Sequence, residues 1–311
     1  MDVVVLEYAL AGFAKGEGMV IEGHAMVRAL VEDLERGGCR VIVPVSTRFS
    51  ECCGIEASEI FPIPEVGDPK EVLGECLRRA EGVVLIAPAF KSALYSLASF
   101  VESAGIRLLG PTLEAISLCS DKYSTYLSLS RAGIGVPKTF CATGEISIQL
   151  PPEFALPLVV KPVDGVGCMG LSLVSNLTEL GEAVSRAVEE SEEKRALVQE
   201  YVEGVHASAS LLSDGEKILP IALNAQIVDL RGPRDRSEYK GGSTPLVHPL
   251  AREALEEAAK AVAAIGGLKG YVGVDLVLGE RPFVIEVNPR LTTSYVGLRL
   301  VAKLNLGIEI V

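Results

Sequence analysis

The sequence predicts an α/β protein with an N-terminal, doubly wound parallel-sheet domain, followed by a second part of α+β type. Three observations support this prediction. The 311 residues are enough for about two domains of ordinary size. In the first third, short and continuously apolar runs alternate with segments of helical periodicity, which is typical of strands that helices cover on both faces. After Gly110 and Pro111 this alternation ends, and several strands follow one another through turns.

The elements of the first third follow in order from these patterns. In residues 23–36, Met26, Leu30 and Leu34 recur at helical spacing on one face, and Gly37 follows as the stop. Further helices are expected at 71–81 and 92–104. Strands are expected at 3–6, 40–45, 82–88 and 106–110.

The second part begins with one expected helix at 114–132. Further helices are expected from Asn176 or Thr178 to about residue 190, and at 249–264. Strands are expected at 157–162, 171–175, 196–202, 207–213, 218–224, 271–278 and 282–288. Residues 227–245 are polar, and a connection of this length is more often functional than structural, so we expect a functional loop there.

Composition and charge exclude several classes of protein. Hydrophobic residues make up 49% and charged residues 23% of the chain, which excludes intrinsic disorder. No apolar stretch is long enough for a spanning helix, and no basic segment precedes the first apolar run as in a signal peptide. The formal net charge of −12, without any basic stripe, argues against binding to nucleic acid. Seven cysteines, an odd number without a C-x-x-C pair, favour the reducing cytoplasm.

The last two expected strands carry a pair of carboxylates. If residues 279–282 form a four-residue hairpin loop, Leu278 pairs with Phe283, and counting back places Asp275 opposite Glu286. Side chains in such a pair have Cβ atoms about 5 Å apart. The same alternation places Gly273, Asp275 and Val277 on one face, together with Val284, Glu286 and Asn288. Val274, Leu276, Leu278, Phe283, Ile285 and Val287 are then expected in the core.

Two facing carboxylates need compensation, because like charges destabilise a sheet. A shared proton, a neighbouring Lys or Arg, or a cation between them would each provide it. Asn288 adds a third oxygen on the same face, and three hard oxygen ligands suit Mg²⁺ or Mn²⁺. The alternative is a surface hairpin with two solvated acids, which the surrounding apolar density disfavours.

A glycine-rich turn follows the strand that ends near Lys161. Gly165, Gly167 and Gly170 have the G-x-G-x-x-G spacing, but a strand follows them rather than the helix of a dinucleotide site. A strand–turn–strand of this kind is typical of a flexible flap over ATP phosphates. Lys161 lies in an apolar run, where a buried lysine needs an anion, although a lysine at a strand end can also extend to the surface.

Five motifs together resemble the ATP-grasp superfamily, over about residues 115–311. They are Lys161, DGVGCMG (164–170), QEYVEG (199–204), GVDLVL (273–278) and FVIEVNPR (283–290). The resemblance implies a pre-ATP-grasp domain at 1–113 and a two-lobed ATP-grasp domain at 114–311. Within the latter, 114–203 would be the central lobe with the glycine flap, and 204–311 the C-terminal lobe with the metal site.

The resemblance also implies roles for single residues. ATP contacts are implied for Lys122, Lys161, Gly165, Gly167, Gly170, Gln199, Glu200, Val202, Glu203 and His206. His206 stands where many members have a glutamate for the ribose. The implied metal ligands are Asp275, Glu286 and Asn288. Arg290 matches the residue that faces the γ-phosphate and the acyl intermediate, and with Lys161 it is the implied catalytic residue.

Over nearly the whole chain, the sequence is similar to archaeal-type ligases that join glutamate to tyramine in methanofuran biosynthesis. The motifs are LEYALAG and GMVIEGHAM (6–26), NAQIV (224–228), EYKGGSTP (238–245) and NPRLTTSYVGL (288–298). They imply that ATP activates the γ-carboxylate of glutamate as an acyl phosphate, which an amine, tyramine, then attacks. Ligases for other amino acids or cofactor precursors, including lysine with an ornithine derivative, are alternatives, as are a phosphotransferase and a nucleotide-binding module without chemistry.

The substrates need polar partners of opposite charge. For glutamate the candidates are Arg234, Lys240, Gly241, Gly242, Thr292, Thr293 and Ser294. For the amine they are Glu7, Glu17 and Glu22. For each, an ordinary loop or strand-end residue is the alternative. Small molecules are therefore the expected partners, together with a possible homodimer, which is common among such enzymes.

Overall fold

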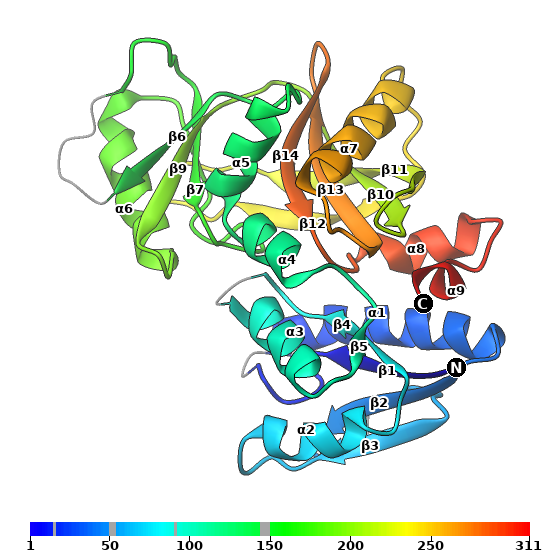
Figure 1. Cartoon of the computed structure of the whole chain (residues 1–311). Helices are drawn as coiled ribbons and strands as arrows, with labels where there is room; N and C mark the ends of the chain where they lie inside the picture. Colours follow the sequence, from blue (N-terminus) through cyan, green and yellow to red (C-terminus); the bar gives the residue numbers. More distant parts are fainter. Residues whose placement is uncertain (15–16, 50–53, 90–91, 144–149) are drawn as a thin grey trace.

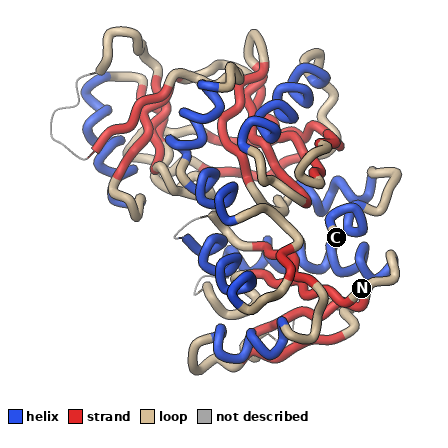
Figure 2. Tube along the Cα trace, in the orientation of Figure 1, coloured by secondary structure: helices blue, strands red, loops and turns tan. Residues whose placement is uncertain are grey.

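The computed structural model describes the chain from residue 1 to residue 311 except for 15–16, 50–53, 90–91 and 144–149; of residues 17–19 it describes the backbone but not the side chains. Three sheets follow one another along the chain, and helices pack on each of them (Figures 1 and 2). This arrangement confirms the predicted fold class.

The first sheet is parallel and has the strand order β3-β2-β1-β4-β5. Its strands are β1(Asp2–Glu7), β2(Arg40–Ser46), β3(Glu59–Ile63), β4(Gly82–Ile86) and β5(Arg107–Leu108). Helix α1(Glu17–Arg36) packs on one face, and α2(Pro69–Leu77) and α3(Ala93–Ser103) pack on the other. The neighbouring residues Val3 and Val4 point to opposite faces and are both fully buried. The continuous apolar run of β1 therefore has the predicted cause, a helical layer on each side.

Strand β3 was not among the predicted strands. It contains Pro62, which cannot donate a hydrogen bond to a neighbouring strand. The structure places β3 at the edge of the sheet, where it pairs with β2 on one side, and an edge strand tolerates such a residue.

The middle of the chain forms a four-stranded sheet of order β6-β9-β7-β8. It consists of β6(Thr139–Thr143), β7(Leu158–Pro162), β8(Ser172–Val174) and β9(Arg195–Glu200), with the 3₁₀ turn η2(Leu177–Glu179) and helix α6(Leu180–Glu190). The single helix expected at 114–132 is two helices, α4(Leu113–Ser120) and α5(Lys122–Arg131). Asp121 separates them because its side chain accepts hydrogen bonds from the backbone N–H groups of Tyr123 and Ser124, and so caps α5.

The third sheet is antiparallel, in the order β12-β11-β10-β13-β14. Its strands are β10(Val205–Ser213), β11(Ile218–Asp229), β12(Glu238–Ser243), β13(Gly270–Leu278) and β14(Pro282–Asn288), and α7(Ala251–Ile265) packs on one face. The loop expected at 227–245 is therefore wrong for about half of its length. Strand β11 continues to Asp229, and β12 returns along it, which leaves residues 230–237 between them.

The last two helices return to the first domain. Helices α8(Ser294–Val301) and α9(Leu306–Ile310) pack against α1, and Tyr295, Leu298, Leu306 and Ile310 share its hydrophobic core. Figure 1 shows these helices and the C-terminus close to α1. Because α8 begins six residues after the end of β14, the segment between them is held by both parts of the molecule.

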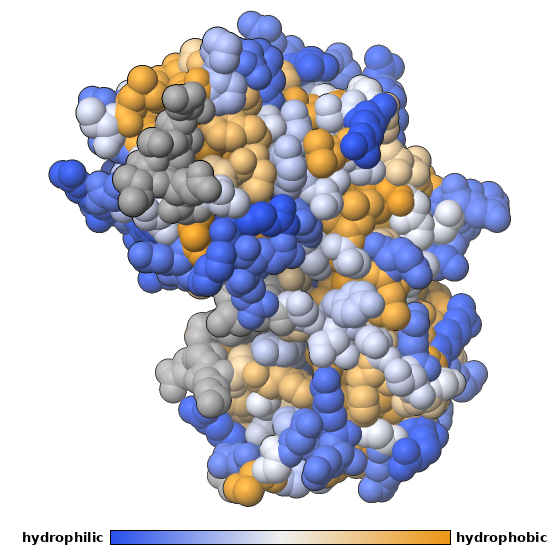
Figure 3. All heavy atoms as spheres, turned by 60° about the vertical axis from the view of Figure 1, so that its left-hand side comes forward, coloured by the Kyte–Doolittle hydropathy of each residue, from blue (hydrophilic) through white to orange (hydrophobic). Residues whose placement is uncertain are grey.

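The surface in Figure 3 shows hydrophilic residues around most of the outline, with separate hydrophobic patches between them. Among the described residues, no helix combines the length and apolar character needed to cross a bilayer.

Candidate functional site

The hairpin of β13 and β14 places Asp275 directly opposite Glu286, and Gly273 opposite Asn288, as predicted. The predicted loop was wrong: Leu278 pairs with Pro282 rather than with Phe283. One extra residue in β14, Ile285, forms a bulge that restores the register before the carboxylates are reached.

The bulge changes which side chains share a face. Val284, expected beside the carboxylates, is buried in the core opposite Leu276. Phe283 and Ile285, expected in the core, are both only partly buried. Ile285 lines the cavity described below, and the Phe283 ring has the Arg281 guanidinium 4.7 Å from its centre. The predicted face is therefore correct at Asp275, Glu286 and Asn288. Between these residues and the loop, the side chains of residues 283–285 do not lie on the predicted faces.

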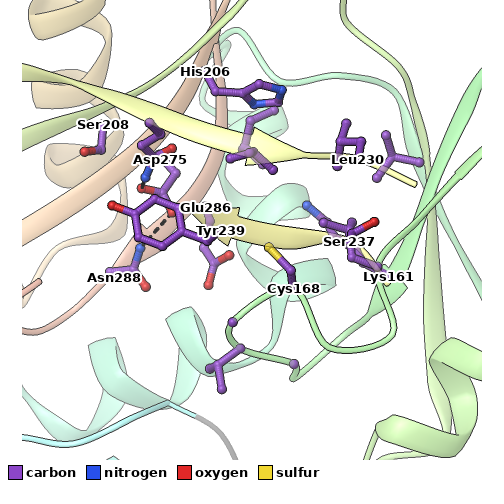
Figure 4. Close-up of a pocket in the computed structure, with 18 of the residues that line it drawn as sticks. Lys161, Cys168, His206, Ser208, Leu230, Ser237, Tyr239, Asp275, Glu286 and Asn288 are labelled. Carbon is purple, nitrogen blue, oxygen red and sulfur yellow. Dashed lines mark hydrogen bonds between the residues drawn. The ribbon is translucent and has the colours of Figure 1, made fainter. Parts of the chain in front are cut away.

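Asp275 has two hydrogen bonds and no cation within ion-pair distance among the described residues. Gln226 Nε2 donates to Oδ1 at 2.9 Å, and Asn288 Nδ2 donates to Oδ2 at 3.2 Å (Figure 4). Burial, together with the negative charge of Glu286, raises the pKa of Asp275 to about 6. The carboxyl group therefore gains from a proton or an added cation.

Glu286 has a cation of its own. Lys122 Nζ lies 2.8 Å from Glu286 Oε1, and it also donates to the backbone oxygen of Gly165 at 2.7 Å. Burial raises the pKa of Glu286, but the charges of Lys122 and Lys161 outweigh it, so the pKa lies below its usual value. Lys122 is placed for this contact because it is the first residue of α5, which the Asp121 side chain caps.

Lys161 lies near the end of β7 and is 7% exposed. Its Nζ donates to Gln199 Oε1 at 3.2 Å, and Gln199 Nε2 donates to Thr139 Oγ1 at 2.9 Å. Burial lowers the pKa of Lys161 to about 8, although Glu286 opposes this effect. Lys161 is thus a buried amine with only a neutral hydrogen-bond partner, which suits an incoming anion.

The glycine-rich turn joins β7 and β8 and borders the same space. Gly165 and Gly167 line the cavity, and Gly167 has a φ of 62°, in the left-handed region that favours glycine. Gly170 lies outside the cavity: its φ is 66°, and a Cβ there would lie 2.9 Å from Pro162 Cγ. Two of the three glycines therefore face the site, and the third allows the turn to fold back on β7.

Arg290 follows β14 and is partly buried. Its Nη1 donates to the backbone oxygen of Leu291 at 3.0 Å, and its Nε is buried without a partner among the described residues. Burial lowers the pKa of the guanidinium, and the nearby carboxylates of Glu286, Asp275, Glu22 and Glu7 oppose this effect. A buried, unpartnered nitrogen is costly, and an anion in this space would complete its hydrogen bonds.

These groups line one cavity of about 560 Å³. Of the residues singled out in the sequence, it brings together Lys122, Lys161, Gly165, Gly167, Gln199, Glu200, Val202, His206, Asp275, Glu286, Asn288, Arg290, Thr292, Thr293, Ser294 and Glu22. Burial lowers the pKa of His206. The residues outside the cavity are Gly170, Glu203, Glu7, Arg234, Lys240, Gly241 and Gly242.

The expected substrate residues outside the cavity have other contacts. Arg234 forms an ion pair with Glu182, and Lys240 forms one with Asp229. Gly242 lies so close to β11 that a Cβ would be 2.3 Å from the backbone oxygen of Ala225. These residues belong to the β11–β12 region that was expected to be a loop, and regular strand pairing holds most of that region away from the cavity.

Glu7 is buried at the end of β1 instead of facing the cavity. Its Oε2 accepts the backbone N–H of Leu10 at 2.7 Å, and a Cβ on Gly23 of α1 would lie 2.4 Å from its carboxyl carbon. Helix α1 thus covers the carboxyl group, and burial raises the pKa of Glu7 to about 7. Of the other two acids in this group, Glu22 lines the cavity, and the side chain of Glu17 lies outside the described part of the chain.

Several cavity residues were not predicted. Gln226, Tyr239, Arg236 and Met26 line the site, from β11, β12, the connection between these strands and α1. Gln226 is detectable in principle, as a polar residue within an apolar alternating strand. The positions of Tyr239 and Arg236 at the cavity depend on the β11–β12 pairing, and that of Met26 depends on contact between distant parts of the chain. The periodicity of the sequence indicates neither of these.

The donor set of the hairpin fits a divalent metal ion. The carboxylates of Asp275 and Glu286 lie at paired positions, and the side-chain amide of Asn288 lies beside Asp275. Burial and the charge of Glu286 raise the pKa of Asp275, so an added cation would stabilise its charged form. Within the described residues there is no group of three or more His, Cys, Asp and Glu side chains that could hold a metal. Any such ion would therefore depend on Asn288 and on oxygens from a ligand, which is the way Mg²⁺ is commonly held beside phosphates.

The comparisons with known proteins agree with this geometry. The ATP-grasp domain family matches residues 119–294, which is more than half of the chain, and the pre ATP-grasp 3 domain family matches residues 39–116. The chain belongs to the ATP-grasp family.

Relatives of known name support the family membership along the whole chain. The tyramine–L-glutamate ligase of Methanocaldococcus fervens is 32% identical over 303 residues, which cover 96% of this chain and 89% of that protein. The enzyme of the same name from Methanocaldococcus jannaschii is 30% identical, covering 96% and 84%. The solved biotin carboxylase of Campylobacter jejuni has a TM-score of 0.77 at 19% identity, covering 99% of this chain and 70% of that one. This last likeness shows a shared fold.

Proposed function

We propose that the protein is an ADP-forming carboxylate–amine ligase that joins the γ-carboxylate of L-glutamate to tyramine through an acyl phosphate. One observation carries the chemistry: a single cavity brings Lys122, Lys161 and Arg290 together with the paired acids Asp275 and Glu286. The two substrates come from the relatives that match almost the entire chain, which are tyramine–L-glutamate ligases.

The cavity suits the approach of two anions. A carboxylate must come close to the triphosphate of ATP, and cations that neutralise both lower the barrier. Among the described residues, Lys161 has no anionic partner within ion-pair distance and Arg290 Nε has no partner, so both are available to phosphate and carboxylate oxygens. The glycine turn, which borders the same space, is suited to cover the phosphates and exclude water.

Asp275, Glu286 and Asn288 would hold one or more Mg²⁺ or Mn²⁺ ions. Such an ion would neutralise phosphate charge and orient the triphosphate. Lys122 compensates the charge of Glu286, so Asp275 is the carboxylate that would gain more from the ion.

The proposed reaction has two steps, phosphorylation of the carboxylate and formation of the amide. A γ-carboxylate oxygen attacks the terminal phosphorus of ATP, the bond to the β-phosphate oxygen breaks, and ADP leaves. The neutral amine then attacks the acyl carbon, the carbon–oxygen bond breaks, and phosphate leaves as the nitrogen releases its proton. Arg290 is placed to stabilise the anionic oxygens in both steps. No cysteine or histidine nucleophile is needed.

For the glutamate, Thr292 and Thr293 remain candidates, and Arg290 is added to them. The candidates from the β11–β12 region lie outside the cavity, namely Arg234, Lys240, Gly241 and Gly242. Thr292 occupies the space that Gly273 leaves open, since a Cβ on Gly273 would lie 2.6 Å from Thr292 Cγ2. Both threonines line the cavity. They follow Arg290 closely in the sequence and come just before α8.

The test is ADP release from ATP and Mg²⁺ with glutamate, with and without tyramine, together with the mass of the product. We expect ADP release that depends on the amine and a product equal to glutamate plus tyramine minus water. Release without the amine, with a stable phosphorylated product, would indicate a phosphotransferase instead. The relatives, which are ligases by name, do not favour that alternative.

Four further expectations remain proposals. We propose a domain division at 113/114 and a lobe division at 203/204, the latter supported by the change of sheet between β9 and β10. We also propose a cytoplasmic enzyme that does not bind nucleic acid, supported by the net charge of −12 and by free thiols at all five described cysteines. A homodimer is the fourth proposal, and sedimentation of the full chain tests it.

A further inference from the structure

Helix α1 supplies one wall of the cavity, although it belongs to the N-terminal sheet. Two of its described side chains line the space, those of Glu22 and Met26. They are four residues apart and so lie on the same side of the helix. Met26 is 5% exposed, whereas Glu22 is an exposed residue of the cavity lining. The wall therefore offers an exposed carboxylate beside a buried thioether.

The opposite wall is formed by Tyr239 of β12. Its ring projects into the cavity on the side of Asp275, Glu286 and Asn288 (Figure 4). Burial raises the pKa of its phenol, and the carboxylates of Asp275 and Glu22 raise it further. The ring therefore lies within electrostatic range of Glu22 on one side and of Asp275 on the other.

Charge is unevenly distributed around the cavity. Lys122 and Lys161 lie at the Asp275–Glu286 face, with which Arg290 also interacts. Arg236 is within electrostatic range of Cys168 in the glycine turn. Among the described cavity residues of α1 and of the segment that begins α8, no cation is present. The groups within electrostatic range of Glu22 are the phenol of Tyr239 and the guanidinium of Arg290.

We propose that the acceptor amine binds between α1 and β12, with its nitrogen at Glu22 and its apolar body between Met26 and the ring of Tyr239. This pocket selects aromatic amines without a carboxylate over the corresponding amino acids. It rests on the proposed ligase function and assigns the acceptor side of that site.

The position of Glu22 fits the reaction. Its charge reaches Arg290, so a nitrogen held by Glu22 lies toward the group that faces the acyl phosphate. The amine arrives as an ammonium ion, which the carboxylate of Glu22 attracts, and it gives up one proton to the solvent before the neutral nitrogen attacks the acyl carbon. An aromatic acceptor also gains stacking energy on the ring of Tyr239. An amino acid acceptor would bring a second carboxylate next to Glu22. The described cation within electrostatic range, Arg290, also interacts with Glu286 and Asp275 and faces the acyl phosphate, so like-charge repulsion from Glu22 would weaken the binding of that acceptor.

The experiment measures amine-dependent ADP release at saturating ATP, Mg²⁺ and glutamate. Tyramine, phenethylamine, butylamine and L-tyrosine are the acceptors. For the unmodified chain we expect kcat/KM at least about 100-fold higher for tyramine than for L-tyrosine. For Glu22→Gln we expect the KM for tyramine to rise about 10- to 100-fold, while the KM values for ATP and glutamate stay within about twofold.

Two more variants make the result specific. Tyr239→Leu should lower kcat/KM for tyramine and phenethylamine by about tenfold and leave butylamine nearly unchanged, because only the aromatic acceptors lose stacking. Ile21→Gln is the matched control, since Ile21 is 73% exposed on the same helix turn and lies outside the cavity. It should behave as the unmodified chain does.

The outcomes separate the two proposals. If no amine supports ADP release, the proposed function is wrong, and the proposed acceptor pocket is wrong as well. If tyramine is a substrate but Glu22→Gln leaves its KM unchanged, or the unmodified chain prefers L-tyrosine, the ligase stands and the acceptor pocket is wrong. Equal losses for aromatic and aliphatic amines in Tyr239→Leu would also contradict the pocket.

Discussion

Lys122 of α5 and Glu286 of β14 form a buried ion pair, with 2.8 Å between Nζ and Oε1. The pair joins the helix before the central sheet to the last strand of the C-terminal sheet. The same Nζ holds the backbone oxygen of Gly165 in the glycine turn. One lysine thus connects the acidic face, α5 and the turn expected to cover the phosphates, and ligands of the acidic face will affect all three.

Replacing Glu286 with Gln should abolish most of the turnover. The change removes a proposed metal ligand and leaves Lys122 without its carboxylate, so we expect kcat to fall at least about 100-fold. Nucleotide affinity should fall less, about tenfold or below, because Lys161 and the turn remain. Turnover is measured by ADP release, and affinity by calorimetric titration with and without Mg²⁺.

The matched control is Glu280→Gln, in the exposed loop of the same hairpin. It removes one negative charge from the β13–β14 hairpin without changing the acidic face, and its activity should remain within about twofold of the original. Full turnover in Glu286→Gln would contradict a role for this carboxylate in metal binding.

Lys161 should take up a proton when the nucleotide binds above neutral pH. Its pKa of about 8 in the free protein means that a large share of the lysine is neutral at pH 8.5. A bound phosphate favours the charged form, so binding draws a proton from the solution. Titrations at pH 8.5 in two buffers of different ionisation enthalpy measure this uptake, and it should disappear in Lys161→Met. Uptake of equal size in both proteins would assign the proton to another group.

The sequence was sufficient to predict the acidic face because strand alternation is a short-range rule. It placed Asp275 opposite Glu286 even though the assumed loop was wrong, because two errors cancelled: the loop is one residue shorter, and Ile285 forms a bulge. A bulge has no sequence signature in this strand, so neither Val284 nor Ile285 could be assigned to its correct face.

Other parts of the site depend on contacts that no local pattern reports. The break between α4 and α5 has a local cause, the cap at Asp121, and was predictable in principle. Burial of Glu7 depends on the close approach of Gly23, and the cavity position of Met26 depends on the packing of α1 against a distant part of the chain. Lys122 was predicted only from the family resemblance, whereas the glycine turn and Lys161 had signals of their own, the glycine spacing and a lysine in an apolar run.

The buried carboxyl group of Glu7 should make folding sensitive to pH. Its pKa is about 7 in the folded chain against 4.5 unfolded, so the folded state binds the proton more tightly. The stability that this group contributes is fully present below pH 4.5 and is lost as the pH rises through 7. The loss amounts to about 3 kcal/mol. The side chain introduced in Glu7→Gln cannot ionise. Between pH 4 and pH 8, the unfolding free energy of this variant should therefore rise by about 3 kcal/mol relative to that of the unmodified chain. Parallel profiles in urea unfolding would show that Glu7 does not titrate in this range.

A buried cluster around Asp33 should control how firmly α8 is held against α1. Asp33 accepts hydrogen bonds from the Tyr295 hydroxyl at 2.7 Å and from Arg299 Nε and Nη2 at 2.9 and 2.6 Å. Asp33→Asn leaves the guanidinium of Arg299, which is 8% exposed, with Glu32 as its remaining carboxylate. Removing one partner of such a pair costs about 3 kcal/mol or more in unfolding free energy.

The double variant Asp33→Asn/Arg299→Met tests whether this cost comes from the pair itself. Because it removes both charges, it should be less destabilised than the sum of the two single variants, by about 1 kcal/mol or more. Chemical unfolding of all four proteins gives the coupling. The cluster joins α1, whose Glu22 and Met26 line the cavity, to α8, which directly follows the cavity residues Thr292 and Thr293. The single variant should therefore raise the KM for glutamate or for the amine more than it lowers kcat. Strictly additive unfolding energies would show that the two residues do not stabilise the α1–α8 contact as a pair.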